Sequence, residues 1–319
     1  MVRSLWLGRL AYPTVVSALE TGLFEALDRG PATVPKLAKT LGVPARGIEV
    51  LTSGCAGLGL LKVRGDLSFE IAPAARPFVV RSSPYFFGAQ LLAADGLQSS
   101  LRRALQRRDN KPVAKLEARS DAAVQAFAQS MEAHSAATAA VAAEVLDMSG
   151  VSSVLDMAGG SGCFARALER RHPRLRATVA DLAPVVELHR RRTFGRVDAI
   201  AADLFDAATW PRGHDCVLLA NVLHDWDEEG VEKILRAARK VLPPAGRCLI
   251  IEVLMDENRA GPKYAALYSV SMVLGDWRSG KQYSYADLKT MLAKAGFRDV
   301  ERGPECGAFH STIVARKEA

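Results

Sequence analysis

The amino-acid sequence predicts an α/β fold in its C-terminal part, preceded by an α-rich N-terminal region. In the C-terminal part, the apolar run Ser152 to Leu155 leads into a glycine-rich turn and then into Cys163–Arg171, which has helical spacing. Further apolar runs follow at strand-like intervals, and two of them end at an aspartate. The N-terminal residues instead contain mostly helical patterns.

Residues 1–95 are predicted to form a winged helix. Four segments have helical spacing: Leu5–Leu19, Gly22–Leu27, Val34–Leu41 and Ala45–Leu61. Gly42-Val-Pro44 separates the last two, and Lys62–Ile71 is typical of a hairpin with its tip at Arg64-Gly-Asp66. Because such units often bind DNA, a ligand-sensing transcription regulator is one hypothesis. The second helix of the pair argues against it, since its residues are mostly small and apolar.

Residues 96–145 are predicted to be a helical linker, because they are rich in alanine, leucine and charged residues without strand-like alternation. Residues 146–319 then form the α/β domain. After the first strands, the predicted elements are a strand at His214–Val222, a helix at Glu228–Val241, a strand at Cys248–Ile251, helices at Tyr264–Trp277 and Tyr285–Gly296, and strands at Phe297–Arg302 and Ala308–Ala315. Together they complete a seven-stranded sheet.

The turn Ala158-Gly-Gly-Ser-Gly162 predicts a nucleoside site. It differs from the G-x-G-x-x-G fingerprint that holds a pyrophosphate, so a nucleoside without phosphates fits better. Asp156 lies at the carboxyl end of the first strand, and Asp181 ends the next strand at the spacing of an acid that binds ribose hydroxyls. Asp203 follows a third strand. These carboxylates could instead be helix N-caps, but their joint pattern favours a ligand.

Several motifs resemble the S-adenosylmethionine-dependent methyltransferases of the caffeate and antibiotic O-methyltransferase type. They are the glycine-rich turn, Val179-Ala-Asp-Leu182, Ala202-Asp-Leu-Phe205, Asn221-Val-Leu-His-Asp-Trp-Asp-Glu228, and the helix Phe127–Ser135. The resemblance covers nearly the whole chain. It implies a Rossmann-like seven-stranded methyltransferase domain behind a winged-helix dimerisation domain, and a homodimer. The implied reaction transfers a methyl group from S-adenosylmethionine to a hydroxyl of an aromatic or polyketide-type secondary metabolite, leaving S-adenosylhomocysteine.

The resemblance also implies the site residues. His224 would be the general base, with Glu252 orienting its ring. Cofactor-binding residues would be Ser135, Asp156, Ala158, Gly159, Gly160, Asp181, Leu182, Asp203, Leu204 and Ala220. Substrate-binding residues would be Met131, Asp225, Met272 and Trp277. As an alternative, His224 only lines the site, and methyl transfer relies on proximity alone.

Three positions depart from the family pattern. Ala158 stands where glycine is usual, Ala220 replaces a lysine, and Gln282 stands where plant members carry a second acid beside the catalytic histidine. A neutral amide cannot stabilise the positive charge of an imidazolium as a carboxylate does. Methylation of carbon or nitrogen, or a non-methylating reaction on the same fold, therefore stays open.

Composition excludes several other classes of function. The chain has 319 residues, of which 49% are hydrophobic, which suffices for substantial cores. Five widely spaced cysteines without a C-x-x-C pair argue against disulfides and zinc, and no His and carboxylate cluster predicts another metal. The net charge of +7 comes from arginine runs without interleaved aromatics, so no nucleic acid is expected. No apolar stretch predicts a membrane span or signal peptide, so a cytoplasmic protein is expected.

Overall fold

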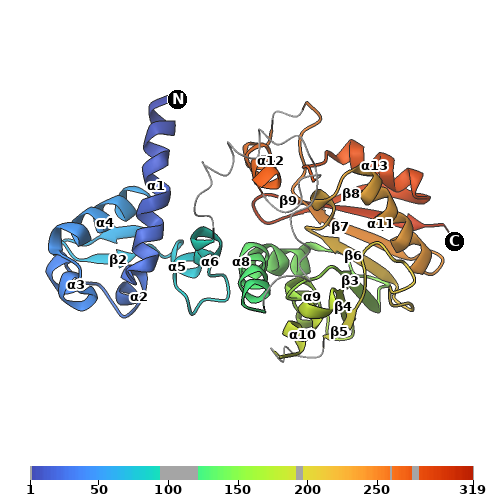
Figure 1. The fold of residues 1–319 in the computed structure, drawn as a ribbon, viewed down its shortest axis with the longest axis horizontal. Helices are drawn as coiled ribbons and strands as arrows, with labels where there is room; N and C mark the ends of the chain where they lie inside the picture. Colours follow the sequence, from blue (N-terminus) through green and yellow to red (C-terminus); the bar gives the residue numbers. More distant parts are fainter. Residues whose placement is uncertain (1, 94–120, 192–196, 259–260, 275–279, 319) are drawn as a thin grey trace. The chain divides into compact units, whose positions relative to one another are not determined.

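The computed structural model describes residues 2–93, 121–191, 197–258, 261–274 and 280–318. The chain forms two compact units, Met1–Asp95 and Gly96–Ala319 (Figure 1). Each unit has its own hydrophobic core. No described helix is long and apolar enough to cross a membrane.

The N-terminal unit has the predicted order of helices followed by a hairpin. Its elements are α1 (Val2–Glu20), α2 (Leu23–Asp28), α3 (Val34–Leu41), α4 (Ala45–Gly57), β1 (Leu61–Val63), β2 (Phe69–Ile71), α5 (Arg76–Val79) and α6 (Gly88–Leu92). Gly42 ends α3 in the left-handed conformation, with φ of 68°. The predicted helix Ala45–Leu61 was too long, because the backbone of Leu61 pairs with Ile71 in the hairpin.

The C-terminal unit is built on a seven-stranded sheet, which confirms the predicted α/β fold. Its elements are α8 (Asp121–Val145), β3 (Ser153–Met157), α9 (Cys163–Arg171), β4 (Arg176–Asp181), α10 (Ala183–Arg191), β5 (Asp198–Ala201), β6 (Cys216–Ala220), the short 3₁₀ helix η2 (Leu223–Asp225), α11 (Glu228–Val241), β7 (Arg247–Glu252), α12 (Lys263–Leu274), α13 (Tyr285–Lys294), β8 (Phe297–Cys306) and β9 (His310–Lys317). The described part of the predicted linker, α8, belongs to this unit and packs on α9.

The strand order is β5-β4-β3-β6-β7-β9-β8. Five neighbouring strands, β5, β4, β3, β6 and β7, are parallel to one another, and β9 runs antiparallel to both of its neighbours, β7 and β8. The chain leaves β3 toward β4 on one side and later returns to β6 on the other. This topological switch point between β3 and β6 is where open α/β sheets bind ligands, at the carboxyl ends of the strands.

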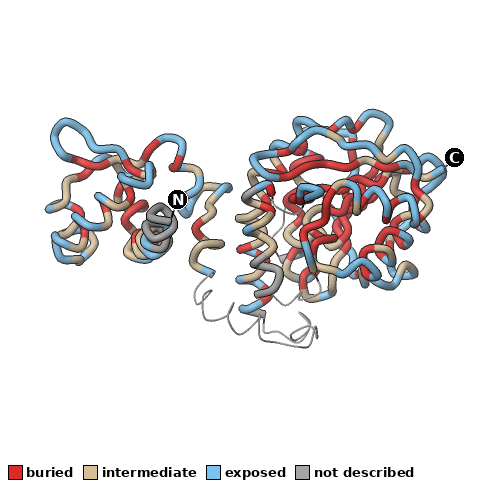
Figure 2. The backbone as a smooth tube through the Cα atoms, turned by 90° about the horizontal axis from the view of Figure 1, so that it is seen from above, coloured by how far each residue is buried: buried red, intermediate tan, exposed pale blue. Residues whose placement is uncertain are grey.

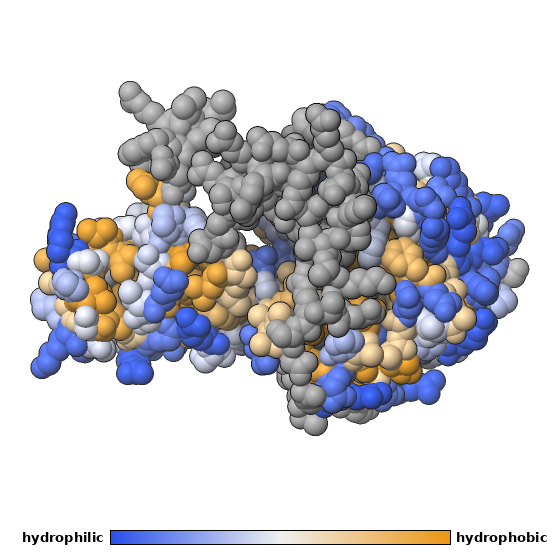
Figure 3. Space-filling view, in the orientation of Figure 1, coloured by the Kyte–Doolittle hydropathy of each residue, from blue (hydrophilic) through white to orange (hydrophobic). Residues whose placement is uncertain are grey.

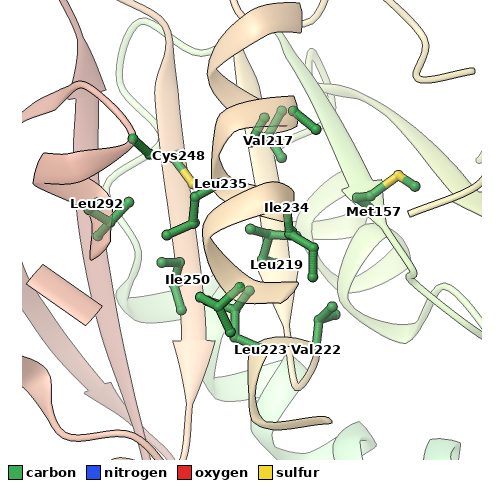
Figure 4. Packing of buried hydrophobic residues seen from close by; sticks show 14 of the residues in the cluster. Met157, Val217, Leu219, Val222, Leu223, Ile234, Leu235, Cys248, Ile250 and Leu292 are labelled. Carbon is green, nitrogen blue, oxygen red and sulfur yellow. The ribbon is translucent and has the colours of Figure 1, made fainter. Parts of the chain in front are cut away.

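Alternate residues of each central strand face opposite layers of helices, as the two-residue period of a strand requires. Val217 and Leu219 pack with α11 and α13, and Figure 4 shows Ile234, Leu235 and Leu292 closing over that face. Residues of the opposite face pack with α8 and α9. The central strands β3, β6 and β7 are buried over almost their whole length, and Figure 2 shows runs of buried residues inside this unit. A sheet covered on both faces holds its strand ends rigidly, and these ends carry the candidate site.

Two predicted strands changed length in ways that matter for the site. β6 ends at Ala220 rather than Val222, because Asn221 takes the left-handed conformation with φ of 56°. β8 runs on to Cys306, four residues beyond the predicted end, because it stays paired with β9 up to His310. The first change turns the chain toward His224, and the second brings His310 to the same edge of the sheet as Glu252.

Candidate active site

The glycine-rich turn joins β3 to α9 in a strained conformation. Ala158 and Gly160 both have φ of 56°, and Gly162 has φ of 72°. The N–H of Ala158 donates to the carbonyl of Ala180, 2.7 Å away, which fastens the turn to β4. A residue with a Cβ pays about 1–2 kcal/mol for left-handed backbone. This explains physically why the position of Ala158 favours glycine.

The turn leaves room for a ligand on one side and packs against a carboxylate on the other. A Cβ added at Gly160 would meet no atom within 4 Å, whereas one at Gly159 would lie 2.6 Å from Cγ of Asp156. Asp156 is fully buried, and its Oδ2 accepts the N–H of Ala165 at 3.3 Å. Its Oδ1 has no hydrogen-bond partner among the described residues. Burial raises the pKa of Asp156 to about 7.

Asp181 links the turn to the end of β4. Its Oδ2 accepts the N–H of Gly160 at 2.8 Å, and its Oδ1 accepts the N–H of Leu182 at 2.7 Å. Burial raises its pKa to about 6, although both backbone donors oppose the shift. Each oxygen has a second acceptor position. The carboxylate is therefore fixed in place and can still accept from two hydroxyls.

Asp203 behaves differently from the other two aspartates. It is exposed in the loop after β5, and its Oδ1 accepts the N–H of Phe205 at 2.8 Å, which is a local turn rather than a helix N-cap. Leu204 beside it is partly buried against the core of the sheet. Ala220, at the end of β6, is also partly buried.

Glu252 builds the turn that carries His224. Its Oε1 accepts the N–H groups of Val222 at 3.0 Å and Leu223 at 2.8 Å, and its Oε2 lies 2.6 Å from Nδ1 of His224. Because a carboxylate only accepts, Nδ1 carries the proton of this bond. The predicted pair is thus brought together, with His224 in η2 rather than in the strand itself.

Two carboxylates determine the electrostatics of His224, which is 5% exposed. Burial by itself would lower its pKa, but Glu252 and Asp225 outweigh burial and raise the pKa to about 9. The Oδ1 of Asp225 lies 3.5 Å from Nε2 of His224, and burial raises the pKa of Asp225 to about 7. For Glu252, burial opposes ionisation, but the imidazolium lowers the pKa below its usual value.

A ladder of aromatic rings leads to His224, and sequence reasoning missed it. The ring of Phe309 stacks on Tyr264 with centroids 3.8 Å apart, Tyr264 on Tyr268 at 5.7 Å, and Tyr268 on His134 at 5.5 Å, all within 14° of parallel. The ring of His224 meets Tyr268 edge-on at 5.8 Å. Tyr264 and Tyr268 share one face of α12 at i, i+4 spacing, which was the one local signal.

The other predicted residues are placed as follows. On α8, Met131 is partly buried and Ser135 is buried. Met272 lies in α12, where its side chain is not described, and Trp277 lies outside the described residues. Gln282 is 3% exposed, and neither atom of its amide has a partner among the described residues.

Comparisons with known proteins identify the family to which the chain belongs. A family model for an O-methyltransferase domain matches residues 105–298, which include the glycine-rich turn, Asp181, His224 and Glu252. The chain belongs to the O-methyltransferase family. Its cofactor is S-adenosylmethionine, and it is a methyltransferase rather than a transcription regulator. Among the described residues of this methyltransferase, no group of three or more His, Cys, Asp or Glu side chains could hold a metal ion.

Individual relatives cover almost all of the methyltransferase. The 3-hydroxy-5-methyl-1-naphthoate 3-O-methyltransferase of Streptomyces sahachiroi is 37% identical over 90% of this chain and 86% of its own length. The mitomycin biosynthesis 6-O-methyltransferase of Streptomyces lavendulae is 30% identical over 95% of this chain and 89% of its own length. Human N-acetylserotonin methyltransferase, solved in complex with S-adenosylmethionine, superimposes with a TM-score of 0.87 at 26% identity, covering 100% and 97% of the two chains.

Proposed function

We propose that the enzyme methylates a hydroxyl group of an aromatic or polyketide-type secondary metabolite, with His224 as general base. The bond between His224 Nδ1 and Glu252 carries this proposal, because in the neutral ring it keeps Nδ1 protonated and leaves Nε2 to receive a proton. The aromatic ladder beside His224 supports a planar acceptor. By its name, the naphthoate relative methylates a hydroxyl on such a ring.

Each residue of the pair has a definite task. S-adenosylmethionine supplies an electrophilic methyl group, so the protein mainly aligns the acceptor and excludes water. A phenol with a pKa of about 10 is a poor nucleophile at neutral pH. Removal of its proton by Nε2 of His224 is expected to contribute about 10²–10⁴-fold to the rate. Glu252 then stabilises the imidazolium, since its carboxylate already touches the other ring nitrogen.

For the cofactor, we propose that Asp181 accepts hydrogen bonds from the ribose hydroxyls, above the open side of Gly160. Asp156 lies beneath Gly159, and its unpaired Oδ1 would accept from the cofactor or from a water beside it. Backbone and apolar contacts from Ala158, Leu182, Asp203, Leu204 and Ala220 would complete the adenosine pocket. On the acceptor side we propose Met131, Asp225, Met272 and Trp277, together with Tyr268.

We further propose that the enzyme is a homodimer formed through its N-terminal unit. Leu10 on α1, Val50 on α4 and Leu58 at the end of α4 are 48%, 53% and 44% exposed. α1 packs on α4, so these side chains lie on neighbouring helices. Figure 3 shows hydrophobic residues on the visible face of this unit. Large apolar side chains exposed on neighbouring helices favour an interaction surface there.

The proposed function is tested with a hydroxynaphthoate acceptor and S-adenosylmethionine, followed by mass spectrometry of the products. We expect one added methyl group, as an ether, and an equal amount of S-adenosylhomocysteine. The same naphthoate with its hydroxyl already methylated serves as the control and should stay unchanged. Methylation of that control on carbon, or of an amino analogue in preference to the hydroxy acceptor, would favour the alternatives that the sequence left open.

The raised pKa of His224 predicts how activity depends on pH. Only the neutral imidazole accepts a proton, so kcat/KM should rise with pH and level off near the pKa of about 9. Asp225→Asn removes one of the two charges that raise this pKa. The rising limb should therefore move to lower pH in the variant. Asp227→Asn, which changes the neighbouring N-cap of α11, is the matched control, and an unmoved limb in Asp225→Asn would contradict the assignment.

A further inference from the structure

Four side chains form a hydrogen-bonded network that the methyl-transfer chemistry does not use, and three of them, His310, Ser135 and Thr138, are buried. Nε2 of His310 lies 3.0 Å from Oδ1 of Asn221, and Nδ2 of Asn221 donates to Oγ of Ser135 at 3.3 Å. On the other side of the ring, Nδ1 of His310 lies 3.2 Å from Oγ1 of Thr138. These hydrogen bonds thus connect the start of β9, the end of β6 and the middle of α8.

The polarity of this network follows from its chemistry. Since the amide nitrogen of Asn221 faces Ser135, its oxygen faces His310 and can only accept. Nε2 of His310 is therefore the protonated nitrogen. Burial lowers the pKa of His310 to about 4, helped by His134, so the ring is neutral and its Nδ1 accepts from Thr138.

The end of the network is a hydroxyl proton without an acceptor. Ser135 is 8% exposed and accepts from Asn221, and its own O–H donates to no atom in the described part of the chain. Buried donors rarely stay unpaired, because each costs the free energy of its lost hydration. The hydrogen bond from Asn221 therefore orients the hydroxyl of Ser135, so that this hydroxyl can donate to a ligand that lies against α8.

The position of Asn221 indicates which part of the cofactor this is. In the proposed cofactor site, Asp181 would bind the ribose at the end of β4, and the methyl group would have to reach the His224 turn that follows β6. Because β3 and β6 are neighbouring strands of the sheet, the amino-acid half of the cofactor would then lie over their ends, near Asn221. That half carries a carboxylate, which is the group that an O–H donor binds most strongly.

We propose that His310 is a positioning residue for the cofactor: through Asn221 it holds Ser135 as a hydrogen-bond donor to the cofactor carboxylate. This inference rests on the proposed cofactor site. In this proposal His310 acts through Asn221 and makes no direct contact with the cofactor. Its replacement should weaken only those ligands that carry the amino-acid group.

The test is calorimetry with two ligands, S-adenosylhomocysteine and 5′-methylthioadenosine, which keeps the adenosine and sulfur but lacks the amino-acid group. His310→Phe should weaken the binding of S-adenosylhomocysteine by about tenfold or more, which is the loss of affinity expected when a hydrogen bond to a charged group is lost. Binding of 5′-methylthioadenosine should not change. His310→Gln keeps a donor for Asn221 and should restore most of the affinity. Thr312→Val, which removes a different hydrogen bond of the same hairpin, is the control and should bind both ligands normally.

Three other outcomes would contradict the proposal or the cofactor site on which it rests. Equal loss of both ligands in His310→Phe, or equal loss in the Phe and Gln variants, would overturn the proposal in favour of a structural role. If His310→Phe does not fold, ¹⁵N chemical shifts of the His310 ring in the wild-type protein identify the protonated nitrogen, and a proton on Nδ1 would overturn it. Wild-type protein that binds neither ligand would instead contradict the proposed cofactor site.

Discussion

Replacing His224 by alanine is expected to lower kcat by about 10²–10⁴-fold, because the acceptor hydroxyl loses the base that removes its proton. Cofactor affinity should stay unchanged, since no contact of His224 reaches the glycine-rich turn. The measurement is the rate of ether formation at saturating acceptor and cofactor. His172→Ala, at the far end of α9, is the matched control. A loss of only a few-fold would mean that the enzyme relies on proximity and alignment alone.

Glu252→Gln tests whether the two residues act as one unit. An amide can no longer stabilise the imidazolium, and the substitution removes the carboxylate that raises the pKa of His224 most. We expect a kcat loss of similar order to that of His224→Ala. The double variant should then be hardly slower than either single variant, because residues that act together are not additive. Additive losses would separate the role of Glu252 in shaping the turn from its role in catalysis.

Asp181→Ala is expected to weaken the binding of S-adenosylhomocysteine by about 10²-fold or more, because two hydrogen bonds to a charged group are lost together. The carboxylate also holds the N–H of Gly160, so the turn itself loses an anchor. Calorimetry measures this loss, with Asp198→Ala on the neighbouring strand as the control.

The same ligands separate Asp181 from His310. In the proposed site Asp181 binds the adenosine side, so Asp181→Ala should weaken the binding of 5′-methylthioadenosine as strongly as that of S-adenosylhomocysteine. Binding of 5′-methylthioadenosine that survives in Asp181→Ala would place the ribose elsewhere and contradict the proposed cofactor site.

Features that depend on a single segment could be predicted from the sequence. Strands and helices follow from periods of 2 and 3.6 residues, so Val34–Leu41 and Cys163–Arg171 were predicted with their observed bounds. The turn at residues 158–162 was predicted for the same reason, since glycines in sequence determine a local backbone. His224 and Glu252 came from the resemblance of their motifs to a family, and the structure brings them together.

The depth and partners of individual carboxylates needed the fold. Asp156, Asp181 and Asp203 look equivalent in sequence, because each follows an apolar run. In the structure Asp156 is buried beneath the turn, Asp181 bridges the turn and β4, and the side chain of Asp203 accepts a backbone N–H in an exposed loop. What distinguishes the three aspartates is the position of each strand in the sheet. The strand order cannot be predicted from any single segment, because it depends on contacts between distant segments.

By itself, then, the sequence determined the fold class, the edge of the sheet that we propose as the nucleoside site and the pair of residues proposed for proton transfer. Only the tertiary structure decided that His134, Tyr268 and Phe309 form a ladder beside His224, and that His310 reaches Ser135 through Asn221. The physical reason is that such contacts depend on the register of β9 against β7 and on the packing of α8, which join residues far apart in the chain.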